Sequence, residues 1–290
     1  MSAPFFLPLC VRHLTPRFGK RAEQLKLERH LIEKPWGRTN VPTSFGATNG
    51  RRIGEIWFEA PNGAHLPLLV KYIFTSEKLS VQVHPNDDQA RERGLARGKS
   101  ECWYILEAEP GATLGLGLRQ SLPTAELREA AIGGYLEDLL DWKPITASDF
   151  FYVPAGTIHA IGAGVTLIEF QQNADVTYRL YDYGRPRELH LEEALAVSVA
   201  DTYHQDHSSP SSNDDGILVN GPIFTLMRVS SDRELLASLA ARRRWVVPLT
   251  GYVRAEEETA SAGECLLLEA GADFEFGPAT VILCGAEGSI

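Results

Sequence analysis

Short apolar runs dominate the chain and constrain its fold more than any other feature. Between residue 25 and about residue 120, runs rich in β-branched, aromatic and aliphatic residues alternate with glycine, proline and asparagine; examples are EIWFEA, LPLLVKYIF, KLSVQV, CWYILEA and GATLGLGL. Such runs, bounded by turn residues, are typical of strands in a barrel or sandwich. Similar runs return after residue 150 and again after residue 216. The sequence therefore predicts a mostly β protein.

One segment breaks the strand pattern. Residues 121–142 read SLPTAELREAAIGGYLEDLLDW, in which Ser121 or Thr124 can cap a helix. Leu127, Ala130 and Ala131 then follow at helical spacing, and a Gly-Gly pair separates this helix from a second short one. We expect a small helical insert between strands.

Length and charge limit the partners. A chain of 290 residues can bury one large or two modest cores. Its formal net charge of -10 disfavours nucleic acid and anionic membranes as general partners, because both would repel it. No apolar run approaches the length of a membrane span, and the four cysteines form no C-x-x-C pair. We expect a cytoplasmic protein whose oligomeric state the sequence leaves open.

The chain divides into four predicted segments. Residues 1–24 are an N-terminal extension, 25–200 a β domain that carries the helical insert, 201–216 a polar linker, and 217–290 a second β domain. All eight histidines lie at or before position 207. If the protein binds a metal through histidine, we expect the first domain to hold it.

A strand in LSVQVHPNDDQ places Ser80, Gln82 and His84 on one face. Side chains two apart on a strand project from the same side at roughly 7 Å spacing, so an amide and an imidazole could reach one ion. A solvated polar strand face is the alternative interpretation of an isolated Q-x-H motif.

Two further side chains could complete a metal site. Glu101 opens the strand ECWYILEA, and His159 lies in VPAGTIHAIG, where Pro154 and Gly156 predict a turn that aims the imidazole inward. The complete set would be Gln82, His84, Glu101 and His159. Two nitrogen and two oxygen donors suit zinc and also tolerate manganese, cobalt or iron.

Taken together, these motifs resemble one family. The Q-x-H pair, then Glu101, then P-x-G-x-x-H resembles the cupin metal site, and glutamine in place of the common first histidine resembles type I mannose-6-phosphate isomerases. The segments EKPWG, GEIWF, LSVQVHP, GKSECWYIL and QQNADVTYRLYDYGRPRELH are similar to that family's segments, in its order. The resemblance covers roughly residues 27–200.

The resemblance implies a fold, an activity and residue roles. The fold would be two cupin-like (jelly-roll) β-barrels, with one Zn²⁺ per chain in the first barrel and none in the second. The activity would be metal-dependent interconversion of mannose 6-phosphate and fructose 6-phosphate through an enediol or enediolate. The zinc ligands would be Gln82, His84, Glu101 and His159. The substrate-site residues would be Ser80, Lys99, Arg179 and Arg185, with Arg179 and Lys99 acting in catalysis.

A phosphate bound to an acidic protein needs local cations. Lys99 and Arg185 could supply them, and Lys71 could be a third. Lys71 lies in LLVKYIF and could equally be a strand residue whose stem packs on apolar surface. Arg179 can stabilise negative charge on the reaction intermediate.

Two other functions use the same residues less well. A cupin oxygenase with ferrous iron would share the barrel. Such sites usually use three histidines or an H-x-H pair, however, and this chain has Gln82 in place of the first histidine of that pair. A non-catalytic sugar-phosphate-binding protein would keep the pocket without needing both Arg179 and Lys99. A P-loop kinase is excluded, because RGLARGKS has Arg93 where that motif requires glycine.

Overall fold

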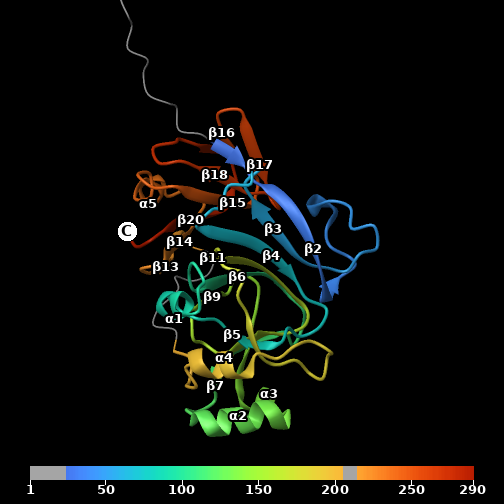
Figure 1. The fold of residues 1–290 in the computed structure, drawn as a ribbon. Helices are drawn as coiled ribbons and strands as arrows, with labels where there is room; N and C mark the ends of the chain where they lie inside the picture. Colours follow the sequence, from blue (N-terminus) through green and yellow to red (C-terminus); the bar gives the residue numbers. More distant parts are fainter. Residues whose placement is uncertain (1–23, 205–213) are drawn as a thin grey trace, which may run out of the picture.

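The computed structural model describes residues 24–204 and 214–290, and these residues form a stack of β-sheets (Figure 1). The middle sheet has the order β2-β3-β4-β11-β6-β9, formed by Glu28–Arg38, Ile53–Glu59, Leu68–Phe74, Val165–Gln172, Glu101–Ala108 and Phe150–Val153. The site sheet has the order β12-β5-β10-β7-β8, formed by Tyr178–Tyr181, Val81–Val83, His159–Ile161, Thr113–Leu118 and Leu140–Pro144. All neighbouring strands in these sheets are antiparallel.

Two more sheets come mainly from the end of the chain. The C-terminal sheet has the order β1-β18-β15-β20-β14-β13, formed by Gln24–Lys26, Leu266–Leu268, Arg244–Thr250, Val281–Glu287, Phe224–Val229 and Gly216–Asn220. The small sheet, β17-β16-β19, is formed by Glu258–Ser261, Tyr252–Ala255 and Glu275–Phe276. The predicted mostly β fold is confirmed, and none of these four sheets closes on itself within the described residues.

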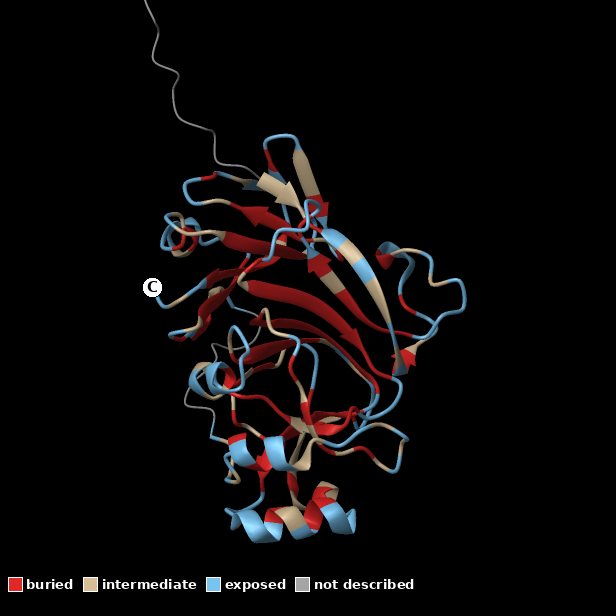
Figure 2. Cartoon of the chain, viewed as in Figure 1, coloured by how far each residue is buried: buried red, intermediate tan, exposed pale blue. Residues whose placement is uncertain are grey.

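The middle sheet is covered on both faces, which explains its composition. Every residue of β4 and of β11 is buried, and Figure 2 shows these strands red along their length. On β4, Val70 and Tyr72 pack in the same core as Trp245 and Leu267 of the C-terminal sheet. Ile73 instead joins the core shared with the site sheet. Because strand side chains alternate, one continuous apolar run serves two cores.

Three short helices, α2 (Thr124–Gly133), α3 (Leu136–Leu139) and α4 (Leu191–Val197), lie at the outer face of the site sheet (Figure 1). The others lie elsewhere: α1 (Asp87–Glu92) near the end of β11, α5 (Arg233–Ala237) and a 3-10 turn, η1 (Thr43–Phe45). Leu127 and Ala130 of α2 pack against the site sheet as their spacing predicted. The predicted helical segment ends earlier than residue 142, because β8 begins at Leu140 and pairs with β7.

The first described strand belongs to the C-terminal sheet. Strand β1 pairs with β18 of the C-terminal sheet, and one apolar core joins residues of the middle and C-terminal sheets. The predicted extension 1–24 and linker 201–216 fall largely outside the described residues. The proposed division into two domains therefore stays a prediction. Among the described residues, no helix has the length and apolar character needed to cross a membrane.

Candidate functional site

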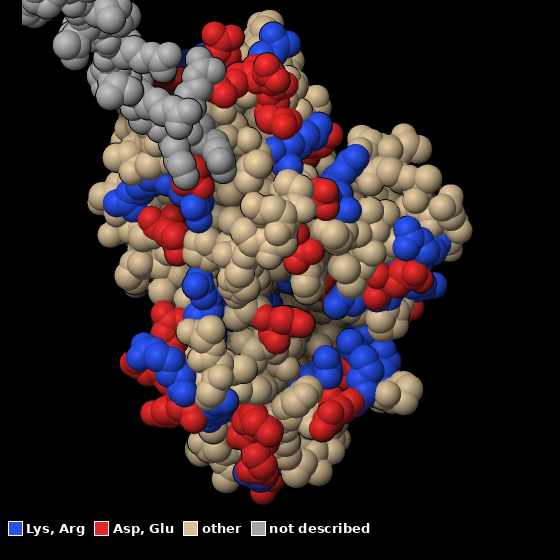
Figure 3. Space-filling model, turned by 45° about the horizontal axis from the view of Figure 1, so that its top comes forward, with Lys and Arg blue, Asp and Glu red and all other residues tan. Residues whose placement is uncertain are grey.

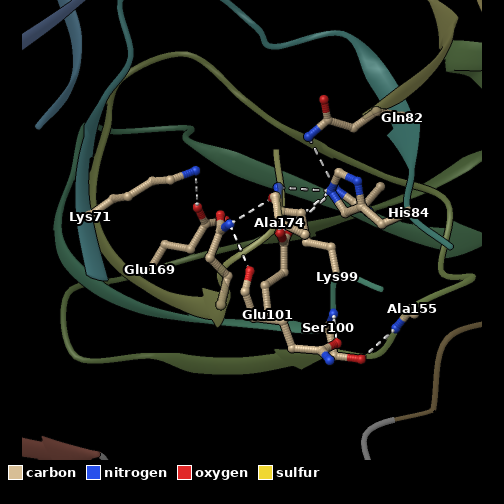
Figure 4. Close-up of polar contacts among 12 residues, drawn as sticks. Lys71, Gln82, His84, Lys99, Ser100, Glu101, Ala155, Glu169 and Ala174 are labelled. Atoms are coloured by element: carbon tan, nitrogen blue, oxygen red, sulfur yellow. Dashed lines mark hydrogen bonds and ion pairs between the residues drawn. The ribbon is translucent and has the colours of Figure 1, made fainter. Parts of the chain in front are cut away.

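The predicted ligands come from three strands on two facing sheets. Gln82 is the central residue of β5, His84 follows that strand, and His159 opens β10. Gln82 and His159 are direct partners across the antiparallel ladder. Glu101 opens β6 on the middle sheet and faces them from the other side (Figure 4).

The turn before β10 has the predicted form. Gly156 adopts a φ of 90°, which favours glycine, and its N–H donates to the carbonyl of His84 at 2.8 Å. This bond ties the loop that ends at His159 to the strand that ends at His84. The turn thus fixes the two imidazoles relative to each other, with ring centroids 4.9 Å apart.

One carboxylate lies between the two imidazoles. His84 Nε2 is 3.4 Å from Glu101 Oε2, and His159 Nε2 is 3.3 Å from Glu101 Oε1. All three side chains are buried, and their ligand atoms lie within 4.8 Å of one another. They are the one such His/Cys/Asp/Glu group within residues 24–204 and 214–290.

The tautomer of His159 shows what these atoms can bind. Its Nδ1 lies 2.9 Å from the carbonyl oxygen of Thr157, which can only accept, so the Nδ1–H donates there and Nε2 carries a lone pair. Burial lowers the pKa of His159, and it lowers the pKa of His84 to about 3. Both rings are therefore neutral near pH 7. A lone pair that faces a carboxylate at close range calls for a cation between them.

The surroundings of Glu101 also fit a cation. Neither carboxylate oxygen accepts a well-formed hydrogen bond within the described residues. The Lys99 ammonium lies 3.0 Å from Glu101 Oε2 and 3.1 Å from His84 Nε2, so a positive group already stands among the ligand atoms. Burial alone would raise the pKa of Glu101, but Lys99 and His84 hold it well below its usual range. The donor set of two imidazoles and one carboxylate suits a divalent metal ion.

Gln82 differs from its predicted arrangement in one respect. Its amide nitrogen, not its oxygen, lies 3.2 Å from His159 Nε2, while Ser80 Oγ lies 3.4 Å from its Oε1. Next to a lone pair, an N–H donor is the favourable orientation. Rotation of the terminal amide by half a turn would exchange its nitrogen and its oxygen, which occupy nearly equivalent positions. The oxygen would then face a bound ion.

A cavity lined by Gln82 and Lys99 adjoins the ligand group, and sequence reasoning missed two buried acids that also line it. Glu169 on β11 accepts from Trp103 Nε1 at 3.0 Å and pairs with Lys71 Nζ at 3.1 Å. Burial raises the pKa of Glu169, and Glu101 raises it further. Glu55 on β3 accepts from Trp57 Nε1 at 2.6 Å. A signal was present: Glu169 is a single acid in the apolar run GVTLIEF, and buried acids require partners.

The predicted substrate residues divide into two groups. Ser80, Lys71, Lys99 and Arg179 line the cavity, together with Gln82. Lys71 lies opposite Glu169 in the strand register and 4.9 Å from the Trp57 ring centroid, so it is not merely a snorkelling side chain. Arg185 is not among the lining residues, whereas Arg187 is.

The face of the molecule shown in Figure 3 carries lysine and arginine side chains interspersed with aspartate and glutamate. The cavity itself combines lysines and arginines with buried acids. Local cations thus accompany the overall acidic composition, as an anionic small molecule would require.

Curated relatives share one activity in their names. The chain is 31% identical over 285 residues to mannose-6-phosphate isomerase of Streptococcus mutans, which covers 80% of this chain and 89% of the relative. It is 39% identical over 177 residues to mannose-6-phosphate isomerase ManA of Bacillus subtilis, covering 56% of each. No protein-family model matches the chain.

Solved structures agree in fold. Mannose 6-phosphate isomerase from Bacillus subtilis superposes with a TM-score of 0.73 at 27% identity, covering 90% of this chain and 99% of the other. A protein structure from Archaeoglobus fulgidus gives a TM-score of 0.73 at 18% identity, with 92% of this chain and 98% of the other covered, and shows likeness of fold alone.

Proposed function

Because the chain belongs to the mannose-6-phosphate isomerase family, we propose that it interconverts mannose 6-phosphate and fructose 6-phosphate in the cavity between the middle and site sheets. The observation that carries this assignment is the buried group of His84, Glu101 and His159, whose lone pairs and carboxylate converge. The fold proposed for these paired sheets is the cupin-like jelly roll, with a second one at the C-terminal end.

The ion we assign to the site is zinc, held by Gln82, His84, Glu101 and His159. Two neutral imidazoles, one amide and one carboxylate would leave a divalent ion with a formal charge of about +1. When bound, it would supply Lewis-acid stabilisation of negative charge on substrate oxygens. The buried cysteines Cys102 and Cys265 are unpaired thiols, which supports a reducing cytoplasmic location.

Two residues are assigned to the charge that develops during the reaction. In this isomerisation a proton leaves one carbon, negative charge builds on an enediolate oxygen, and the proton returns to the neighbouring carbon. Arg179 lies beside Gln82 in the strand register, and its Nε has no hydrogen-bond partner within the described residues. The Lys99 ammonium lies 3.1 Å from His84 Nε2. Both can stabilise the developing oxyanion.

Glu169 is the group we assign to proton transfer. Trp103 and Lys71 each hold one of its oxygens, so its position in the cavity is fixed. Burial raises the pKa of Glu169 toward the pH at which the enzyme works, and a general base is most effective when its pKa lies near that pH. Glu169→Gln should lower kcat by about 10²- to 10⁴-fold with little change in metal content. An unchanged kcat would exclude this role.

Metal removal tests the function as a whole. The purified protein should contain about one divalent ion per chain, lose it to a chelator together with thermal stability, and regain both when zinc is added. Hexose-phosphate interconversion, followed by a coupled assay, should follow metal content. Binding of mannose 6-phosphate without interconversion would favour a non-catalytic sugar-phosphate-binding protein. Oxygen consumption with bound iron would favour an oxygenase.

A further inference from the structure

Two arginines in the loop after β12 share one buried acid. Asp182 is 2% exposed. Arg187 donates to it from Nε at 2.5 Å and from Nη2 at 2.7 Å, which is a bidentate pair. Arg185 Nη1 lies 3.5 Å from the same carboxylate. The loop backbone is compact here, because the Arg185 N–H donates to the Asp182 carbonyl at 3.0 Å.

The two arginines nevertheless point to different places. Arg187 lines the cavity that also contains Gln82, Lys99 and Arg179. Arg185 does not line it; its Nη2 donates to the backbone carbonyl of Lys78, and its guanidinium lies 5.3 Å from the Tyr183 ring centroid. Arg185 thus joins its loop to the segment before β5.

The lysines that line the cavity are already paired with buried acids. Lys34 lies 3.5 Å from Glu55, and Lys71 lies 3.1 Å from Glu169. Lys99 pairs with Glu101, as described above. These cations cannot add net positive charge for an incoming dianion unless their own partners are displaced.

Arg179 and Arg187 differ from the lysines in charge balance, because Arg179 has no acid partner in the described chain and the single Asp182 carboxylate is shared between Arg187 and Arg185, which leaves that group with a net positive charge. Within the described residues Arg179 forms no ion pair; its Nη1 donates to the backbone carbonyl of Glu188 at 2.6 Å and its Nε is unpartnered. Arg187 uses Nε and Nη2 for Asp182, so its Nη1 donors have no partner in the described chain. Asp175, an exposed acid, also lines the cavity, and the Glu188 carboxylate is exposed. The Arg179–Arg187 end of the cavity is where cationic donors are free.

We propose that Arg187, oriented by Asp182, binds the phosphate group of the substrate beside Arg179, and that Arg185 holds the loop in place. This inference rests on the proposed function, and it assigns specificity for a phosphorylated sugar to Arg187. A guanidinium that donates to a carboxylate through Nε and Nη2 can still donate to phosphate oxygens through its remaining Nη hydrogens. Asp182 is the positioning residue, because a bidentate pair fixes the plane of the guanidinium.

The test compares Arg187→Ala with Arg185→Ala in the metal-loaded enzyme, with Arg254→Ala on the exposed C-terminal surface as a control. Arg187→Ala should raise KM for mannose 6-phosphate roughly 10- to 100-fold, because a charge-assisted hydrogen bond contributes that much. Its kcat should change much less, since Arg187 touches the phosphate and not the reacting carbons. Arg185→Ala should raise KM less than Arg187→Ala, and Arg254→Ala should leave KM unchanged.

Inorganic phosphate is a second probe that does not require turnover. Phosphate should raise the Tm of the unmodified protein and inhibit it competitively, and both effects should weaken in Arg187→Ala. Arg187→Lys keeps the charge without the fork and should give intermediate values; it also serves if the alanine variant does not fold. Asp182→Asn should raise KM because Arg187 loses its orientation.

The outcomes separate this inference from the proposed function. If the enzyme isomerises mannose 6-phosphate but Arg187→Ala and Arg187→Lys leave KM and phosphate inhibition unchanged, the inference is wrong. It is also wrong if Arg185→Ala has the larger effect. If the protein shows no isomerase activity yet phosphate stabilises it through Arg187, the proposed function fails and the anion site stands.

Discussion

The interior beside the site sheet and the interior beside the small sheet are both closed by antiparallel strands, but their side chains differ in kind. The first contains seven buried acids, lysines and histidines: Glu55, Lys71, His84, Lys99, Glu101, His159 and Glu169. The second packs Met227, Val229, Val246, Leu266, Cys284 and Ala286 in one apolar cluster. Within residues 214–290 the buried charged side chains are Arg228 and Arg244, and Arg244 donates to the Ala272 carbonyl.

The difference has an energetic meaning. Buried charges cost desolvation energy, which ion pairs offset only in part. In the site interior the charges are paired, as in Lys71 with Glu169, yet the Glu101 oxygens and the Arg179 Nε lack hydrogen bonds. The apolar interior carries less of this cost, since its neighbouring buried charges are Arg228 and Arg244, of which the Arg244 Nε lacks a hydrogen-bond partner. The comparison indicates that burial in the C-terminal region stabilises the fold. In the site region, the charges needed for binding and chemistry lower the stability of the fold.

Removing the negative charge of Glu101, which lies between the two imidazoles, should have the largest effect on activity. Glu101→Gln is nearly isosteric but takes away the one negative ligand, so the protein should lose its metal and at least 1000-fold in kcat, about 4 kcal/mol in the barrier. Metal analysis and the coupled assay measure this. Because the substitution leaves the buried Lys99 ammonium without its carboxylate partner, the Tm of the metal-free protein should also fall. Retained metal with full activity would contradict the proposed ligand set.

A cavity in the apolar interior should act on stability alone. Leu266→Ala, at a fully buried position of β18, should lower the free energy of unfolding by about 3 kcal/mol. At a temperature where the variant remains folded, its metal content and KM should match those of the unmodified enzyme. Denaturant unfolding gives the first quantity. Loss of metal at that temperature would show that the two interiors are coupled more closely than we infer.

Gln82→Glu tests whether the site interior depends on charge or on shape. A carboxylate is a stronger ligand than an amide, so metal content should hold or rise. The formal charge of the site would fall from about +1 to about 0, and kcat should drop about tenfold, or about 1.4 kcal/mol. Full metal occupancy with unchanged kcat would mean that the glutamine serves geometry.

The smallest expected effect concerns a surface acid of the C-terminal region. Burial raises the pKa of Asp215, but the Ser230 hydroxyl and the backbone N–H groups of residues 230–232 outweigh it and hold the pKa at about 2. The lowered folded-state value means that this carboxylate stabilises the protein above about pH 4 and that the contribution is lost between about pH 4 and pH 2.

Asp215→Asn should therefore lower the free energy of unfolding by about 1 kcal/mol at pH 7, and by less at pH 3. Denaturant unfolding at the two pH values measures the difference. Arg228→Gln, which removes the cation 3.8 Å from Asp215 and leaves the hydrogen bonds, is the matched control. An equal loss at both pH values would contradict this explanation.

Period-two patterns and turn residues were enough to predict a mostly β chain, the helix that buries Leu127 and Ala130, and the turn before His159. These are local properties, set by which neighbouring side chains share a face. The sequence also indicated which side chains would converge: Gln82 and His84 stand two apart on one strand, and the structure brings His84 together with Glu101 and His159. That these residues and Gln82 bind a metal stays a prediction.

Contacts between distant strands were not accessible in this way. The partnership of Lys71 with Glu169 joins β4 to β11, and the choice between Arg185 and Arg187 depends on how one loop folds around Asp182. Two arginines separated by one residue look alike in a sequence, and only their surroundings distinguish the one that lines the cavity. The covering of the middle sheet on both faces likewise follows from packing between strands far apart in the chain, since a continuous apolar run fits several buried arrangements.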